Sequence, residues 1–168
     1  NAGQGITSGT STYSSKSSFG RRKVLSQLQG MGINSGSYSW NWASPEYTSY
    51  YTDETGNLHI VAWKDQTLYD AVCNSDLNVT NVTTVKLPLP LWGGFYAAPD
   101  GNFYVTVGQK NLNEDNSIIA VRILKYSRAW KLLGATDIGG GYTNMFEGIY
   151  IPFDAASLRM TQIGSTLI

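Results

Sequence analysis

Residues 98–109, APDGNFYVTVGQ, decide the fold class of this chain. The first four residues fit a type I turn, because Pro99 presets φ at the second position and Asp and Gly are accepted at the positions that follow. From Asn102 to Val107 the side chains then alternate between two faces, as they do along a β-strand. With residues 94–98 as the partner strand, the stretch predicts a β-hairpin.

The same unit occurs earlier in the chain. Residues 50–61, YYTDETGNLHIV, align without gaps on residues 95–106, FYAAPDGNFYVT, which places Gly56 and Gly101 in matching positions 45 residues apart. Both copies have an aromatic residue pair, an acidic turn, Gly-Asn and an alternating apolar strand. Third and fourth strands are expected at residues 67–73 and 82–87, and again at 118–126 and 130–138. Four strands in about 45 residues is the period of a β-propeller blade.

A third copy begins in residues 157–168, SLRMTQIGSTLI, with a strand, a turn around Gly164 and the start of a second strand. An insertion of about 18 residues, containing GGGYTNMFEGIYIPF, separates it from the second copy. An apolar strand edge without a partner invites pairing with another chain. We therefore expect a missing segment or a second copy of the chain to complete the ring.

The composition changes along the chain predict four regions. Residues 1–18 are rich in Gly, Ser and Thr and predict a flexible leader, of which residues 1–2 resemble the remnant of a cleaved affinity tag. Residues 19–45 predict a lead-in segment with a short helix or strand. Two propeller blades are expected over residues 46–138, and residues 139–168 hold the insertion and the start of a third blade.

Through the pair GNLHIV and GNFYVTV, the repeat resembles bacterial β-propeller proteins over about residues 40–168. The resemblance implies an all-β fold of blades with four antiparallel strands each, in a ring that is incomplete or completed by a partner. It is a resemblance to a type of fold and not to a family with one activity. It therefore implies no functional residues.

The composition narrows the classes of function. Lys and Arg balance Asp and Glu at 12 each, which argues against nucleic-acid binding. Charged residues make up 14% of the chain, against about 25% in an average domain. Aromatic residues are abundant instead, with 11 Tyr and 5 Trp. This composition is typical of extracellular β-proteins and predicts an extracellular or cell-surface location. No apolar run approaches the roughly 18 residues that predict a membrane-spanning helix.

No residue pattern predicts catalysis, a metal or a cofactor. The one histidine, His59, aligns with Tyr104 and is expected to be structural, and no GxSxG motif accompanies it. One Cys and one His do not make a zinc site. Residues 111–118 resemble a calcium loop but lack its glycine and its final glutamate. Acids for glycoside hydrolysis could come from separate blades, with Glu46, Asp53, Asp70, Glu147 and Asp154 as the pool.

Four aromatic residues are the candidate ligand-binding residues: Trp40, Trp42, Tyr47 and Tyr50. Their rings could stack on sugars, or they could form the core between blades. The sequence thus favours a non-catalytic binding or scaffold module of a secreted or cell-surface protein, which contacts protein or glycan through its loops. The alternatives are a fragment of a propeller glycosidase or lyase, and a structural repeat without a ligand.

Overall fold

The computed structural model describes residues 47–139, 151–153 and 158–168. Within these ranges the regular structure consists of ten β-strands, without a helix, so the expected all-β class is confirmed. The leader, the lead-in segment with Trp40 and Trp42, and most of the insertion lie outside the described residues. In the part that is described, no helix is long and apolar enough to cross a membrane.

The first sheet contains the strands β1 (Thr48–Thr52), β2 (Leu58–Lys64), β3 (Thr67–Cys73) and β4 (Val79–Lys86). They lie in sequence order, and each pairs with the next in antiparallel fashion. This is the connection pattern that short turns between successive strands produce.

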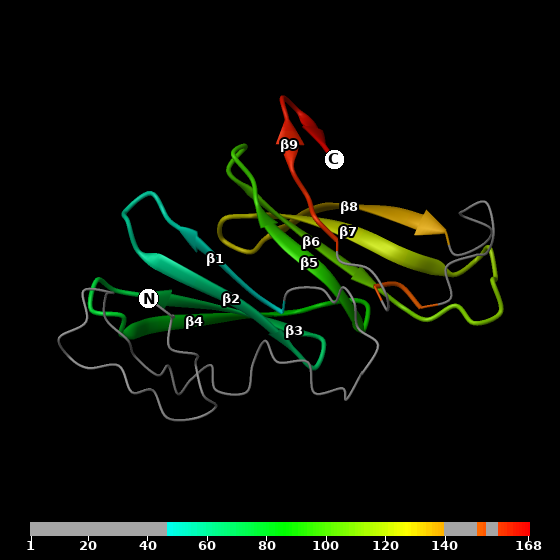
Figure 1. The fold of residues 1–168 in the computed structure, drawn as a ribbon, viewed down its shortest axis with the longest axis horizontal. Helices are drawn as coiled ribbons and strands as arrows, with labels where there is room; N and C mark the ends of the chain where they lie inside the picture. The colour runs from blue at the N-terminus through cyan, green and yellow to red at the C-terminus, as the bar shows by residue number, and fades with distance from the viewer. Residues whose placement is uncertain (1–46, 140–150, 154–157) are drawn as a thin grey trace, which may run out of the picture.

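The second sheet has the same order and contains β5 (Leu91–Ala97), β6 (Asn102–Gly108), β7 (Ile119–Ser127) and β8 (Leu132–Gly139). Figure 1 shows it beside the first sheet, with β5 and β6 nearest to β1 and β2. A two-stranded hairpin of β9 (Gln162–Ile163) and β10 (Thr166–Leu167) follows, at the position where the sequence predicts a third hairpin. All three described sheets are open, so the ring stays a prediction.

The turns that open the two sheets have the same backbone geometry. The amide of Gly56 donates to the carbonyl of Asp53 at 3.0 Å, and the amide of Gly101 donates to the carbonyl of Ala98 at 3.2 Å. Both glycines have a positive φ, 86° and 80°, which residues with a side chain rarely adopt. The ungapped alignment of the two segments therefore pairs residues that share a conformation.

The core lies between the two sheets. It is built from one face of β2 and β3 and the facing side of β6 and β7, and Leu87 and Trp92 also belong to it. Phe103, Val105 and Val107 share one face of β6, as the alternation predicts, and all three are fully buried. The opposite face of β6 is also covered, because Thr106 donates a hydrogen bond to Met160 Sδ at 3.4 Å. The segment before β9 thus packs against the second sheet.

Candidate functional site

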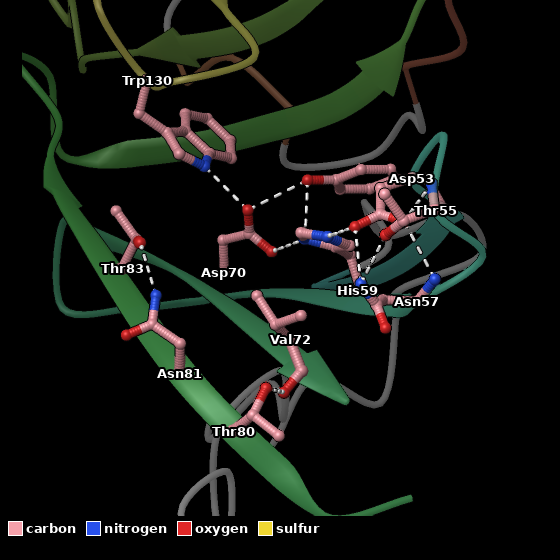
Figure 2. A network of polar contacts seen from close by, with 11 residues as sticks. Asp53, Thr55, Asn57, His59, Asp70, Val72, Thr80, Asn81, Thr83 and Trp130 are labelled. Atoms are coloured by element: carbon pink, nitrogen blue, oxygen red, sulfur yellow. Dashed lines mark hydrogen bonds and ion pairs between the residues drawn. The ribbon is translucent and has the colours of Figure 1, made fainter. Parts of the chain in front are cut away.

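One polar cluster lies between the two sheets (Figure 2) and consists of Tyr51, Asp53, His59, Asp70 and Trp130, which we call the Asp70 network. The hairpin of β1 and β2 places Tyr51 directly opposite His59. The adjacent strand β3 contributes Asp70, which lies opposite Val61 of β2. His59 and Asp70 are only 9% and 3% exposed. A buried carboxylate is costly unless it is hydrogen-bonded or paired with a charge, so the partners of Asp70 decide what this cluster does.

Asp70 accepts three hydrogen bonds from side chains. One comes from His59 Nδ1 to Oδ1 at 2.8 Å, and one from the Tyr51 hydroxyl to Oδ2 at 3.0 Å. The third comes from Trp130 Nε1 to Oδ2 at 2.8 Å and crosses from the second sheet to the first. These bonds satisfy both carboxylate oxygens within the protein.

The imidazole of His59 is held on both sides. Its ring stacks on Tyr51 with centroids 4.3 Å apart and planes 24° from parallel. Its second nitrogen, Nε2, lies 3.3 Å from Asp53 Oδ2 in the turn before β2. Each ring nitrogen thus faces a carboxylate oxygen, which fixes the orientation of the ring.

Asp53 accepts hydrogen bonds within the turn between β1 and β2 in addition to its contact with His59. Its Oδ1 accepts hydrogen bonds from the amides of Thr55 and Asn57, both at 2.9 Å, and its Oδ2 accepts one from Asn57 Nδ2 at 3.0 Å. Hydrogen bonds from Asn57 and Thr55 hold the pKa of Asp53 well below its usual range. Asp53 therefore stays ionised in the native protein and holds the turn in shape.

The hydroxyl of Tyr51 remains a donor in the network. Burial raises its pKa, and the negative charge of Asp70 together with their hydrogen bond raises it further. The guanidinium of Arg128 lies 5.6 Å from the centre of the Tyr51 ring and only partly offsets this effect. The neutral phenol is thus the form that fits beside the carboxylate.

Trp130 is the residue of the network that the sequence did not reveal. The sequence places it at the start of a strand over residues 130–138, but β8 begins at Leu132, so Trp130 lies in the preceding turn. Its φ of 58° is unusual for a residue with a large side chain. The indole packs 4.5 Å from the Phe103 ring and 5.7 Å from the Tyr126 ring. The turn therefore aims the indole at the first sheet, where it reaches Asp70.

A cleft of about 220 Å³ lies elsewhere, between β1, β5 and the segment before β9. Its lining consists of Ser49, Gly94, Phe95, Tyr96, Leu158, Arg159 and Met160. None of the residues of the Asp70 network lines this cleft. Phe95 of the lining packs against Tyr51 and Trp130, so the cleft borders the network, but no acid or base group of the network is among its described lining residues.

Of the four predicted ligand-binding residues, the structure describes Tyr47 and Tyr50. Tyr47 is half-buried and packs 5.5 Å from the Trp63 ring, which places it at the margin of the core. Tyr50 is 68% exposed on β1. Trp40 and Trp42 lie outside the described residues.

The loop that resembles a calcium site closes on itself. Asn111 is buried, its Oδ1 accepts a hydrogen bond from the amide of Asp115, and its Nδ2 donates to the carbonyl of Asp115 at 3.1 Å. Asp115 in turn accepts two hydrogen bonds from Ser117. Across residues 47–139, 151–153 and 158–168, no three His, Cys, Asp or Glu side chains gather in a way that could hold a metal ion.

Comparison with known proteins adds no family to this picture: no protein-family model, no curated protein and no solved structure matches the chain.

Proposed function

We propose that the chain is a non-catalytic binding or scaffold module of a secreted or cell-surface protein, which contacts a glycan or protein partner. In this proposal β1–β4 and β5–β8 are successive blades of a β-propeller, and β9–β10 begins a third blade. The single observation that carries the proposal is that none of the acid and base groups of the Asp70 network lines the described cleft. Catalysis by His59 and its carboxylates would need a substrate within hydrogen-bonding reach of them.

The hydrogen bonding of the network supports a structural role for its residues. Asp70 has three donors, and each nitrogen of His59 has a carboxylate at 2.8 or 3.3 Å. A general base has to give up one of these contacts to accept a proton from a substrate. A closed network of this kind instead rigidifies a core and specifies how its parts fit together.

The second candidate function, a fragment of a glycosidase or lyase, has less support. A general acid in such an enzyme needs a raised pKa, whereas hydrogen bonds lower the pKa of Asp53. No carboxylate is among the seven described residues that line the cleft. Glu46, Glu147 and Asp154 from the predicted pool of acids lie outside the described residues.

The proposal is tested by binding and turnover measurements on the same preparation of the full chain. A glycan array and an immobilised panel of extracellular proteins measure binding, and release of new reducing or unsaturated ends from each bound glycan measures turnover. We expect saturable binding to at least one ligand without turnover. Binding to none of them would overturn the module proposal, and sustained turnover would support the enzyme instead.

Two variants separate the exposed aromatic candidate, Tyr50, from the half-buried one, Tyr47. Tyr50→Ala removes an exposed ring, and Tyr47→Phe keeps the packing of Tyr47 against Trp63 while it removes the hydroxyl. If Tyr50 stacks on the ligand, Tyr50→Ala weakens binding and Tyr47→Phe leaves it unchanged. His59→Gln tests the enzyme alternative, because any genuine turnover by the network would be lost in this variant.

A further inference from the structure

Two N-glycosylation motifs follow each other directly at the outer edge of the first sheet. Residues 78–80 and residues 81–83 both read Asn-Val-Thr and fit the pattern Asn-x-Ser/Thr without proline in the middle. No other part of the 168-residue sequence fits this pattern. In a secreted protein such a motif is an acceptor for a bulky, hydrophilic glycan and is expected at the surface.

The second motif lies within β4, the edge strand of the first sheet. Among the described strands β4 pairs with β3 alone, and Asn81 lies opposite Val72 of β3. A free strand edge is a template for pairing with another chain, and proteins protect such edges. Asn81 is exposed, so a glycan on its side chain would extend into solvent beside this edge.

The side chains on one face of β4 become more exposed toward Asn81. Val85 packs against the core, Thr83 is half-buried and Asn81 is exposed. These residues share a face because the side chains of a strand alternate, and Figure 2 shows Asn81 and Thr83 on the same side of the strand. Asn81 therefore lies beyond the margin of the core, and a sugar attached to it displaces no described core residue.

The side-chain amide of Asn81 can carry a sugar and keep its native contact. Asn81 Nδ2 donates to Thr83 Oγ1, the hydroxyl of its own motif, at 3.5 Å. The amide nitrogen of asparagine carries two hydrogens. Glycosylation replaces one of them, and the other remains available to Thr83. The native fold is thus compatible with a glycan at this nitrogen.

The first motif takes part in the turn between β3 and β4. The backbone amide of Asn78 donates to Asn74 Oδ1 at 2.9 Å, and the carbonyl of Asn78 accepts from the amide of Asn74 at 3.0 Å. The hydroxyl of Thr80 donates to the carbonyl of Val72 at 3.2 Å. A glycan at Asn78 would have to fit this tight turn, so the second motif is the better acceptor.

We propose that Asn81 is an N-glycosylation site. In this modification Asn81 Nδ2 forms a bond to C1 of a lipid pyrophosphate-linked oligosaccharide. The bond between C1 and the pyrophosphate oxygen breaks, Nδ2 loses one proton, and the lipid pyrophosphate leaves. The inference rests on the proposed function, because this motif is a glycan acceptor in secreted proteins. Asn81 is not among the described residues that line the cleft, so the glycan leaves that lining unmodified.

The test is the intact mass of the full chain, expressed in the secretory pathway of cultured animal cells and isolated from both cells and medium. We expect a mass above that of the polypeptide by one N-linked glycan, which a peptide N-glycosidase removes. Treatment in heavy-oxygen water should leave a labelled aspartate at position 81, which peptide mass spectrometry locates. An unmodified chain that still binds a ligand on the glycan array would overturn this inference alone. A glycosylated chain that binds no ligand would overturn the module proposal alone.

Matched variants assign the glycan to one of the two motifs. Asn81→Gln and Thr83→Ala are expected to abolish the modification, whereas Thr83→Ser keeps a hydroxyl in the motif and should retain it. Asn78→Gln and Thr80→Ala make the same changes in the first motif and should leave the glycan in place. A glycan that persists in Asn81→Gln and is lost in Asn78→Gln would overturn the assignment.

Discussion

The indole Nε1 of Trp130 donates a 2.8 Å hydrogen bond to Asp70 Oδ2, and this bond joins two sheets through residues 60 positions apart in the sequence. Trp130 stands in the turn before β8, whereas Asp70 stands in the middle of β3. The bond therefore links the turn between β7 and β8 of the second sheet to the strand β3 of the first sheet. If it is structural, its loss must appear in the free energy of unfolding.

Trp130→Phe keeps most of the ring packing and removes the Nε1 donor. A hydrogen bond to a charged group contributes about 1.5–3 kcal/mol, so we expect the free energy of unfolding to fall by about that amount. Urea denaturation of the full chain, followed by circular dichroism, measures it. An unchanged midpoint would show that Asp70 does not depend on the indole.

The positive φ of Trp130 allows a comparison with Leu77, which occupies the turn between β3 and β4 with the same φ of 58°. In each turn the amide of this residue donates a 2.9 Å bond to a carbonyl three residues earlier. Glycine relieves backbone strain at both positions. We expect Leu77→Gly to change the free energy of unfolding by less than about 1 kcal/mol, and Trp130→Gly to lower it by more than about 3 kcal/mol.

Similar losses in the two glycine variants would contradict this prediction. They would show that the turn matters in itself and that the packing and hydrogen bond of the Trp130 side chain do not.

Tyr51 gives the protein a dependence on alkaline pH. Burial and the charge of Asp70 raise its pKa, so the native state keeps the phenolic proton above pH 10, where the unfolded chain releases it. The native state then binds more protons than the unfolded state, and stability falls as the pH rises above the usual tyrosine pKa. We expect the free energy of unfolding to decrease between pH 9.5 and pH 11, approximate limits set by that usual value.

Tyr51→Phe should flatten this alkaline decrease, although it also lowers stability at neutral pH by removing the hydroxyl. The pKa of Tyr126 is raised by burial as well, so Tyr126→Phe is the control for a general effect of buried tyrosines. A decrease of the same slope in wild type and Tyr51→Phe would contradict the assignment.

Asp100 gives a dependence at acidic pH. Burial acts to raise its pKa, but hydrogen bonds from Asn102, Tyr104 and Lys125 overcome this and lower the pKa to about 2. Its stabilising effect is present above the usual value of 3.8 and is lost as the pH falls through about 2. NMR titration of the Asp100 carboxyl carbon measures the pKa directly, and a value near 3.8 would refute the prediction. In Tyr104→Phe, which removes one donor, we expect a higher pKa.

The strands could be predicted from the sequence because their signals are local. Turn residues such as Pro99 and Gly101 and the alternation from Phe103 onward depend on neighbours along the chain. The structure confirms the all-β class and places β3 over residues 67–73, as the sequence predicts. The bounds of the fourth strands were less accurate. The turn that holds Trp130 has a left-handed residue with no glycine or asparagine to mark it.

The Asp70 network could be predicted only in part. The alignment of His59 with Tyr104 indicated a structural position, and both side chains contact an acid of the preceding turn, Asp53 and Asp100 respectively. Nothing in the sequence indicates that Asp70 meets Trp130, because periodicity assigns residues to faces and does not say which side chains meet across two sheets. The cleft was missed for the same reason, since its lining comes from three separate segments.

A double-mutant cycle between Trp130→Phe and Asp70→Asn is the most direct test of the account that the Asp70 network is a structural link between two sheets. The free energies of unfolding of wild type, both single variants and the double variant are measured in urea at neutral pH. We predict a coupling energy of at least about 1 kcal/mol, as for residues in one hydrogen-bond network. Losses that add within about 0.3 kcal/mol would contradict the link.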